Sequence, residues 1–227
     1  MKLGVVTGLK REAACLSIQT EPNGLSVLCS GADSGRAEKH ARRLLEQGCR
    51  ALVSFGVAGG LAEDLSAGDL VIPGVVVTSD GSSFSPATNW RTRLIEALPK
   101  NGMVSQGALF GSEALISSAA EKSSLHLETG AVAVDMESHR VARIAAEAGV
   151  PFLCLRAISD DASAVLPDWV VGTVDADGST RYATVLKRIL LNPREIGKLI
   201  RLSRDSEAAF ATLRRVAGLA GPLLCFA

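Results

Sequence analysis

Short, largely apolar runs alternate along the chain with segments in which apolar positions recur every three or four residues. Residues 2–7 and 25–29 are such runs, and each precedes a segment of helical spacing, the first beginning near Lys10 and the second ending near Gln47. Runs of this length favour buried strands, and the wider spacing favours helices with one apolar side. The beginning of the chain therefore predicts two strand–helix units.

Residues 131–161 predict a strand, a helix and a second strand. Residues 131–134 and 152–158 are apolar runs, and apolar positions at helical spacing lie between them. Each predicted strand is followed by carboxylates, in residues 135–137 and in residues 159–161. If the two strands are parallel and the helix crosses between them, both groups of carboxylates lie at the edge of the sheet where ligands bind in open α/β sheets.

The remainder of the chain predicts a similar mixture of short elements. A polar and short segment, residues 79–89, lies in its middle. Further strands are predicted at residues 51–55, 69–72, 75–78 and 103–110, and further helices at residues 90–98 and from 111–116 onward.

Composition sets the outer bounds. A chain of 227 residues that is 47% hydrophobic can bury a substantial core, and one compact domain is the expected arrangement. The 24 basic and 24 acidic residues cancel, and aromatic residues make up only 4% of the chain. This balance gives no indication of nucleic acid as a partner, because a nucleic-acid surface needs basic patches and stacking side chains.

The cysteines and the length of the apolar runs predict the compartment, and the histidines bear on metal binding. The five cysteines form no CxxC pair, which favours free thiols in a reducing cytoplasm. The first apolar run is too short for a secretory segment, and no stretch reaches the ~18 apolar residues of a membrane span. The three histidines are isolated from one another and from the cysteines, so neither a metal site nor a bound cofactor is expected.

Three motifs carry a resemblance to a known family. Residues 134–137 (VDME) and 156–160 (RAISD) resemble the paired signatures of the purine nucleoside phosphorylase and methylthioadenosine/S-adenosylhomocysteine nucleosidase superfamily, and residues 56–61 (GVAGGL) resemble its glycine-rich turn. The resemblance covers residues 1–161. It implies an α/β, phosphorylase/hydrolase-like three-layer fold, in which a twisted mixed β-sheet is flanked by helices and residues 1–227 form one domain. It also implies a homo-oligomer, with a dimer favoured.

The resemblance implies a catalytic set as well. Asp160 would protonate the leaving purine at N7, and it would need a proton near neutral pH, to which the adjacent Asp161 could contribute. Glu12 would handle the attacking water, and Arg156 would neutralise Glu12 and Glu137. Two alternatives stay open here: Glu12 as a solvated carboxylate in a first helical turn, and Arg156 with Asp160 as a structural ion pair.

Other residues are implied to bind the substrate. Glu137 would hold the ribose hydroxyls with both carboxylate oxygens, and Met136 would pack beneath the sugar. Leu115 stands where family members stack a phenylalanine on the adenine, so aliphatic packing would replace stacking. The remaining substrate-binding positions are Ala58, Gly59, Ile116 and Ser159.

The sequence favours water over phosphate as the nucleophile. Val57 stands where relatives commonly carry a hydroxyl residue that phosphorylases use on phosphate. Against this, the small residues of 30–37 precede a helix and could expose N–H groups to an anion, with Arg36 as an added cation. An ordinary strand-to-helix turn explains the same residues. We therefore expect hydrolysis, with phosphate retained as a possible co-substrate.

The last part of the chain departs from the soluble nucleosidases. Residues 181–215 contain nine basic and three acidic residues and predict two basic amphipathic helices, divided at Asn192 and Pro193. Such helices either pack on their own domain or contact an anionic membrane surface. Residues 162–215 resemble the hopanoid-associated phosphorylase-like branch of the superfamily, through Leu166-Pro167, Asp177-Gly178, 190–193 and 199–202.

That branch resemblance implies the substrate. It indicates adenosylhopane, a lipophilic 5′-substituted adenosine from which adenine is released, and peripheral contact with the inner membrane surface. The short 79–89 segment, longer in nucleosidases, suggests an open 5′ end. Two alternatives remain: a soluble methylthioadenosine/S-adenosylhomocysteine nucleosidase, and a nucleoside-binding protein without catalysis.

Overall fold

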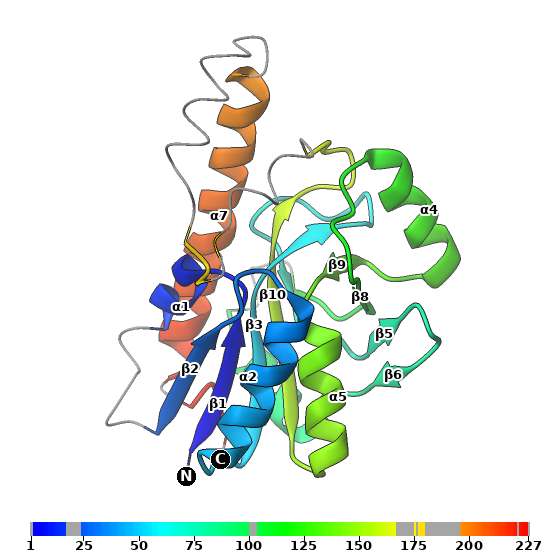
Figure 1. Cartoon of the computed structure of the whole chain (residues 1–227). Helices are drawn as coiled ribbons and strands as arrows, with labels where there is room; N and C mark the ends of the chain where they lie inside the picture. The colour runs from blue at the N-terminus through cyan, green and yellow to red at the C-terminus, as the bar shows by residue number, and fades with distance from the viewer. Residues whose placement is uncertain are drawn as a thin grey trace.

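A computed structural model of the chain describes residues 2–16, 24–99, 104–166, 175, 177–179, 196–221 and 223–226. Its strands form one curled sheet with helices on both sides (Figure 1). The strands are β1 Leu3–Thr7, β2 Leu25–Cys29, β3 Ala51–Gly60, β4 Leu70–Val71, β5 Val76–Thr78, β6 Ser83–Phe84, β7 Val104–Ser105, β8 Leu109–Gly111, β9 Ala133–Asp135 and β10 Phe152–Asp160. The helices are α1 Lys10–Cys15, α2 Ser34–Glu46, α3 Thr88–Glu96, α4 Ala119–Thr129, α5 Ser138–Ala148 and α7 Ile196–Ala220.

Two long strands, β3 and β10, form the centre of the sheet and run parallel to each other. Strand β1 pairs in parallel with the first half of β3 and with β2. The remaining short strands extend the sheet from the other ends of β3 and β10, in the order β6-β5-β8-β9-β3-β10-β4-β7. The predicted mixed sheet with helices on both sides is therefore confirmed.

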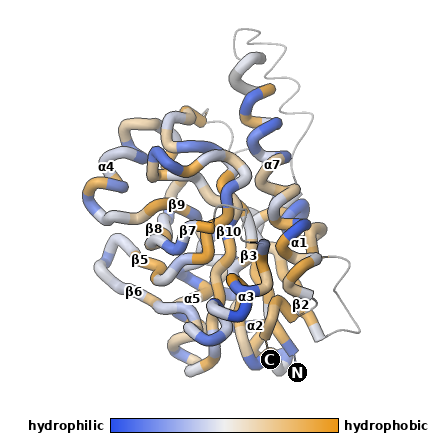
Figure 2. Tube along the Cα trace, turned by 180° about the vertical axis from the view of Figure 1, so that it is seen from behind, coloured by the Kyte–Doolittle hydropathy of each residue, from blue (hydrophilic) through white to orange (hydrophobic). Residues whose placement is uncertain are grey.

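The central strands are buried on both faces because their neighbouring residues pack into different cores. Val5 and Val53 point into a core with α1, α3 and the second half of α7, whereas Val6 and Leu52 point into a core with α2 and α5. Figure 2 shows the resulting run of hydrophobic residues along the central strands. Burial on both faces explains why these strands are continuous apolar runs in the sequence.

The prediction that residues 131–161 form two parallel strands is wrong. Strand β9 pairs antiparallel with β3 at Gly59–Gly60, whereas β10 pairs parallel with β3, so β9 and β10 run in opposite directions. β10 pairs along one side of β3 as far as Gly59, and β1 pairs with residues 51–54, so β9 pairs only with the end of β3. The pairing of this three-residue strand therefore depends on the neighbours that the fold gives it.

The predicted helix from 111–116 also begins later than expected. Helix α4 starts at Ala119, after the N-cap Ser118, whose side chain accepts a hydrogen bond from the Glu121 amide in a capping box. Residues 112–114 form a turn instead, in which Ser112 Oγ donates to the Ala114 carbonyl (2.6 Å). The predicted strand 103–110 is divided into β7 and β8, which pair with different strands, β4 and β5.

The second of the two predicted C-terminal helices is α7, and the first lies outside the described residues, as do Pro167 and Trp169. The second half of α7 is buried through Phe210, Leu213 and Val216, and its first half extends beyond the sheet (Figure 1). Arg201, on the first half, forms an ion pair with Asp161 (2.6 Å). Within the described ranges, none of the helices has the length and apolar character needed to span a membrane.

Candidate active site

A pocket of about 210 Å³ lies where β3, β9 and β10 end. Although β9 and β10 run in opposite directions, Asp135 and Glu137 at the end of β9 and Asp160 at the end of β10 all line it. Nine of the ten predicted site residues line the pocket: Glu12, Ala58, Gly59, Leu115, Ile116, Met136, Glu137, Ser159 and Asp160. The tenth, Arg156, lies behind this lining and contacts residues that form it.

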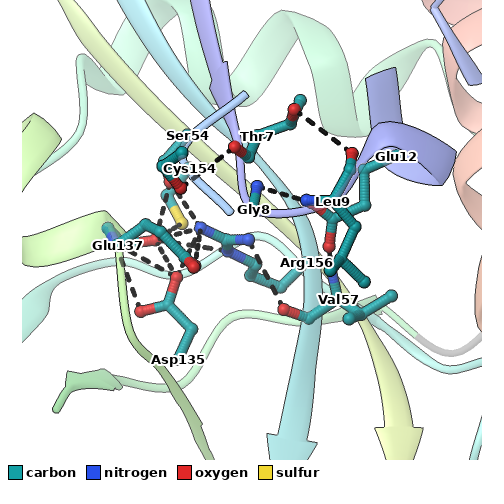
Figure 3. Close-up of polar contacts among 12 residues, drawn as sticks. Thr7, Gly8, Leu9, Glu12, Ser54, Val57, Asp135, Glu137, Cys154 and Arg156 are labelled. Atoms are coloured by element: carbon teal, nitrogen blue, oxygen red, sulfur yellow. Dashed lines mark hydrogen bonds and ion pairs between the residues drawn. The ribbon is translucent and has the colours of Figure 1, made fainter. Parts of the chain in front are cut away.

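Glu12 enters the pocket from the first turn of α1 and is held by three backbone amides. Its Oε2 accepts hydrogen bonds from the N–H groups of Gly8 (2.7 Å) and Leu9 (2.8 Å), and its Oε1 accepts one from Val57 (2.8 Å) (Figure 3). Only 2% of Glu12 is exposed. The alternative that it is a solvated helix-start carboxylate is therefore wrong.

Burial raises the pKa of Glu12, while the Arg156 charge and the three amide hydrogen bonds oppose that rise. A carboxyl group with a raised pKa is a stronger base once ionised, which suits it to take a proton from water near neutral pH. The geometry is thus compatible with the expected role of Glu12 in activating a nucleophile.

Two glycines allow this carboxylate to approach its neighbours closely. A Cβ atom on Gly56 would lie 2.5 Å from both Arg156 Nη1 and Glu12 Oε1. A Cβ atom on Gly8 would lie 2.8 Å from Glu137 Oε1. Because real Cβ contacts are longer, only glycine leaves room for the charged groups at these positions.

Arg156 is fully buried in β10 and forms its ion pair with Asp135. Its guanidinium also donates to the hydroxyls of Ser54 (2.5 Å) and Ser138 (3.0 Å), and Glu137 Oε2 lies 3.6 Å away. Sequence reasoning placed Glu12 and Glu137 against Arg156 and missed Asp135 as its nearest partner. The group of Glu12, Asp135, Glu137 and Arg156 is called the Arg156 cluster below.

Asp135 has a second contact that explains its position. Its carboxylate accepts hydrogen bonds from the amide (3.1 Å) and the hydroxyl (2.6 Å) of Ser138, at the start of α5. Asp135 therefore joins the end of β9, the start of α5 and the buried guanidinium of β10.

Glu137 is the third carboxyl group of the Arg156 cluster, and like Glu12 and Asp135 it lines the pocket. It is the N-cap residue of α5 and is 5% exposed. Burial raises the pKa of Glu137; Arg156 opposes this, and the charges of Asp135 and Glu12 add to it. The cluster holds three carboxyl groups around one guanidinium, so the carboxyl groups compete for a single positive charge.

Asp160 lies at the end of β10, and its partner is a residue that sequence reasoning missed. Its Oδ2 accepts a hydrogen bond from Lys122 Nζ of α4 (2.5 Å), and its Oδ1 accepts one from Ser159 Oγ (2.7 Å). Lys122 is completely buried. Nothing in the sequence around Lys122 signals this contact, because the two residues are 38 positions apart. Asp160 and Lys122 are called the Lys122 pair below.

The structure also excludes the proposed Arg156–Asp160 ion pair, because each residue binds a different partner. Four residues along a strand span about 13 Å, too far for a side-chain contact between them. Asp161 does not face Asp160 either: its carboxylate accepts hydrogen bonds from Ser163 and Arg201. A contribution of Asp161 to the proton affinity of Asp160 is thus not supported by its contacts.

The rest of the pocket wall is aliphatic. Leu115 and Ile116 line it from the turn before α4, and Met136 and Leu166 complete it. Among the described lining residues, none is aromatic. Leu115 thus lines the pocket, and its packing against a base stays a prediction.

The loop before α2 does not present a free cation. Arg36 Nε donates to the Ser30 carbonyl (2.5 Å) and Nη2 to the Gly31 carbonyl (3.1 Å), so the guanidinium is bound to its own loop. Asp33 caps α2 by accepting a hydrogen bond from the Arg36 amide (2.7 Å). Ala32 alone of this loop lines the pocket. Among the described residues, no group of three or more His, Cys, Asp or Glu side chains is placed to hold a metal ion.

The described part of the loop around Gly178, residues 175 and 177–179, is called the Gly178 loop below and lies against the start of α1. The Gly178 carbonyl accepts a hydrogen bond from the Lys10 amide (3.0 Å), and Lys10 Nζ forms an ion pair with Asp177 (2.6 Å). A Cβ on Gly178 would lie 2.2 Å from Cys29 Sγ, and its φ of 80° is one that favours glycine. This loop therefore contacts Lys10, which precedes Glu12 by two positions in the chain.

The chain is similar to a described protein family and to curated nucleosidases. The model of a family described as the phosphorylase superfamily matches residues 23–191. A 5′-methylthioadenosine/S-adenosylhomocysteine nucleosidase of Mycobacterium bovis is 30% identical over 156 residues, which are 52% of this chain and 61% of that protein. One of Actinobacillus succinogenes is 27% identical over 70% of this chain and 86% of its own length. The match to the Mycobacterium protein thus spans about three fifths of its length.

Solved structures share the fold. The 5′-methylthioadenosine/S-adenosylhomocysteine nucleosidase of Neisseria meningitidis, in complex with methylthio-immucillin-A, superposes with a TM-score of 0.73 at 17% identity, over 96% of this chain and 98% of that one. The futalosine hydrolase of Helicobacter pylori superposes with a TM-score of 0.70 at 17% identity, over 96% and 97%. At these identities the likeness concerns the fold.

Proposed function

This chain belongs to the phosphorylase superfamily, and from that premise we propose that it cleaves the N-glycosidic bond of a 5′-substituted adenosine and releases adenine. One observation carries the proposal: Glu12, Glu137 and Asp160 converge on a single pocket from three separate segments.

The proposed roles follow from the positions of the carboxylates. The purine lies between the aliphatic wall of Leu115 and Ile116 and the carboxyl group of Asp160. The ribose lies over Met136, with its hydroxyls on Glu137. As the glycosidic bond breaks, its electron pair passes to the purine, which takes a proton from Asp160. The oxocarbenium-like ribose that remains is attacked by the nucleophile.

Water is the proposed nucleophile. The amides of Gly8, Leu9 and Val57 are backbone donors of the kind that bind phosphate, but here all three donate to the Glu12 carboxylate. A phosphate at this place would meet a carboxylate, and Arg36 is bound to its own loop. Glu12 takes the proton from water as the oxygen adds to C1′, and Arg156 balances the resulting charges.

Adenosylhopane is the proposed substrate. Two features support a lipophilic 5′ group: the Gly178 loop, which packs beside the start of α1, and a first half of α7 that extends beyond the sheet with Ile200 64% exposed. The names of the curated relatives favour methylthioadenosine or S-adenosylhomocysteine as an alternative. The described part of the tail argues for only moderate membrane attraction, because Arg201 already has an acidic partner.

The deciding experiment measures adenine release by chromatography from adenosylhopane and from methylthioadenosine, in phosphate-free buffer and then with phosphate. Release from adenosylhopane alone, without phosphate, is expected. Preference for methylthioadenosine would contradict the lipophilic substrate, and a requirement for phosphate would contradict water as the nucleophile. No adenine from either substrate under either condition would contradict the proposed activity itself.

We propose that the enzyme is a cytoplasmic homo-oligomer, with a dimer favoured, that binds peripherally to the inner membrane surface. Light scattering tests the oligomer. Flotation with vesicles tests membrane binding: binding to anionic but not to neutral vesicles is expected, and equal recovery with both would contradict an electrostatic contact.

A further inference from the structure

Lys122 is a completely buried lysine that none of the steps above uses. It lies in the first turns of α4 and reaches the end of β10, where its ammonium donates to Asp160 Oδ2 (2.5 Å) and to the carbonyl of Asp161 (2.7 Å). It is absent from the pocket lining, whereas Asp160 is part of it. Lys122 therefore lies behind Asp160 as seen from the pocket.

Such a group is costly to bury. The effective penalty for removing an ammonium ion from water is several kcal/mol, and a structural link between α4 and β10 could be made more cheaply by apolar side chains. Lysine at this position is therefore better explained if its charge acts on Asp160 during the reaction.

We infer that Lys122 is a positioning residue for the departure of the base: it orients Asp160 and stabilises the carboxylate left when Asp160 has given its proton to the purine. The inference rests on the proposed function. The atoms balance without another reactant: the C1′–N bond breaks, its electron pair goes to the purine, and the proton of Asp160 goes to the purine nitrogen. Asp160 then carries the negative charge and takes its next proton from water.

Asp160 already has a partner at each oxygen, Ser159 at Oδ1 and Lys122 at Oδ2. Both partners can donate a hydrogen bond to the carboxylate that remains after the transfer. The charge that proton donation creates thus already has a partner, so little rearrangement is needed as the base departs.

The test compares two leaving groups on the same 5′-substituted ribose, that of whichever substrate (adenosylhopane or methylthioadenosine) the wild type cleaves: adenine, which needs a proton to leave, and 4-nitrophenolate, which does not. Asp160→Asn calibrates the pair, since it should stop adenine release and leave nitrophenolate release nearly unchanged. Lys122→Met should lower kcat for adenine release about 30-fold or more, with KM within about threefold and nitrophenolate release within about threefold of wild type.

Lys122→Gln serves as a second variant in case the methionine variant fails to fold, because it keeps an N–H donor near Asp160 and removes only the charge. Ser118→Ala is the matched control: it removes the N-cap of α4 and should lower the midpoint of thermal unfolding without changing the ratio of the two rates. Thermal unfolding of all variants shows that each is folded.

The outcomes separate the two levels of the proposal. If wild type releases no adenine, the proposed function fails. If Asp160→Asn stops both reactions, the assignment of Asp160 as the acid fails. If these two results are as expected and the Lys122 variants slow both reactions equally, or leave adenine release within threefold of wild type, Lys122 is only structural and the inference is overturned.

Discussion

In the Arg156 cluster, three buried carboxyl groups share one guanidinium, whereas in the Lys122 pair one carboxylate meets one ammonium. Burial raises the pKa of Glu12 and of Glu137, since a single Arg156 cannot neutralise every charge around it. The Lys122 pair is balanced and accepts a hydrogen bond from Ser159 as well. The two ends of the pocket are therefore suited to different tasks, one to take up protons and one to stabilise the charge that follows proton release.

The largest effect is expected at Glu12, the proposed general base in the Arg156 cluster. Glu12→Gln preserves most of the side-chain volume and removes the group that would accept the proton of water. We expect adenine release to fall on the order of 10³-fold, within the range typical of a lost general base. KM should change little. Chromatographic adenine release measures it, and an unchanged rate would show that Glu12 has no part in the reaction.

The next largest effect concerns folding stability. Arg156→Met leaves the carboxylate of Asp135 buried without its ion-pair partner, which typically costs about 3–5 kcal/mol. Urea unfolding should show this loss, and adding Asp135→Asn should recover part of it. Arg143→Met is the matched control, because its pair with Asp80 is exposed. If Arg156→Met unfolds like wild type, the pair carries no structural role.

The raised pKa values predict that folding stability depends on pH with the opposite sign to that expected for an ordinary salt-bridged carboxylate. The folded protein holds protons on Glu12 and Glu137 above the usual pKa of 4.5, whereas the unfolded chain has released them. Stability should therefore be present at low pH and be lost as pH rises from about 4.5 through the raised values. In Glu137→Gln this decline should be smaller. Urea unfolding at pH 5.5 and pH 8 measures it.

The raised pKa of Glu12 also predicts how the reaction depends on pH. Because Glu12 must be ionised to act as a base, the acid limb of the kcat/KM profile should lie above pH 4.5 in the wild type. A limb at or below pH 4.5 would show that burial does not raise the pKa of the group on which catalysis depends.

The smallest effect is expected just outside the Lys122 pair. Arg201 and its partner Asp161 form an exposed pair, with 55% and 26% of their side chains accessible. Such pairs contribute about 0–1 kcal/mol. Arg201→Ala should leave adenine release within about twofold of wild type. A loss comparable with that of the Lys122 variants would mean that Asp161, rather than Asp160, carries the function at this end.

Much of the fold and the site could be predicted from local sequence. The central strands are apolar runs because both their faces are buried, and the motifs at residues 56–61, 134–137 and 156–160 identify positions that the structure brings to one pocket. Local patterns failed where a short element depends on its neighbours. Strand β9 pairs antiparallel with the end of β3, and α4 begins after the N-cap Ser118 and not at 111–116.

What the sequence by itself determined is the set of chemical groups: which carboxylates end which strands, which glycines leave room beside them, and which arginine lies within a buried strand. Only the tertiary structure decided how these charges are paired. Arg156 meets Asp135, and Asp160 meets Lys122 from a helix 38 residues away. The physical reason is that strand and helix patterns depend on spacing along the chain, whereas a buried charge is stabilised by whichever opposite charge the packing brings within contact distance.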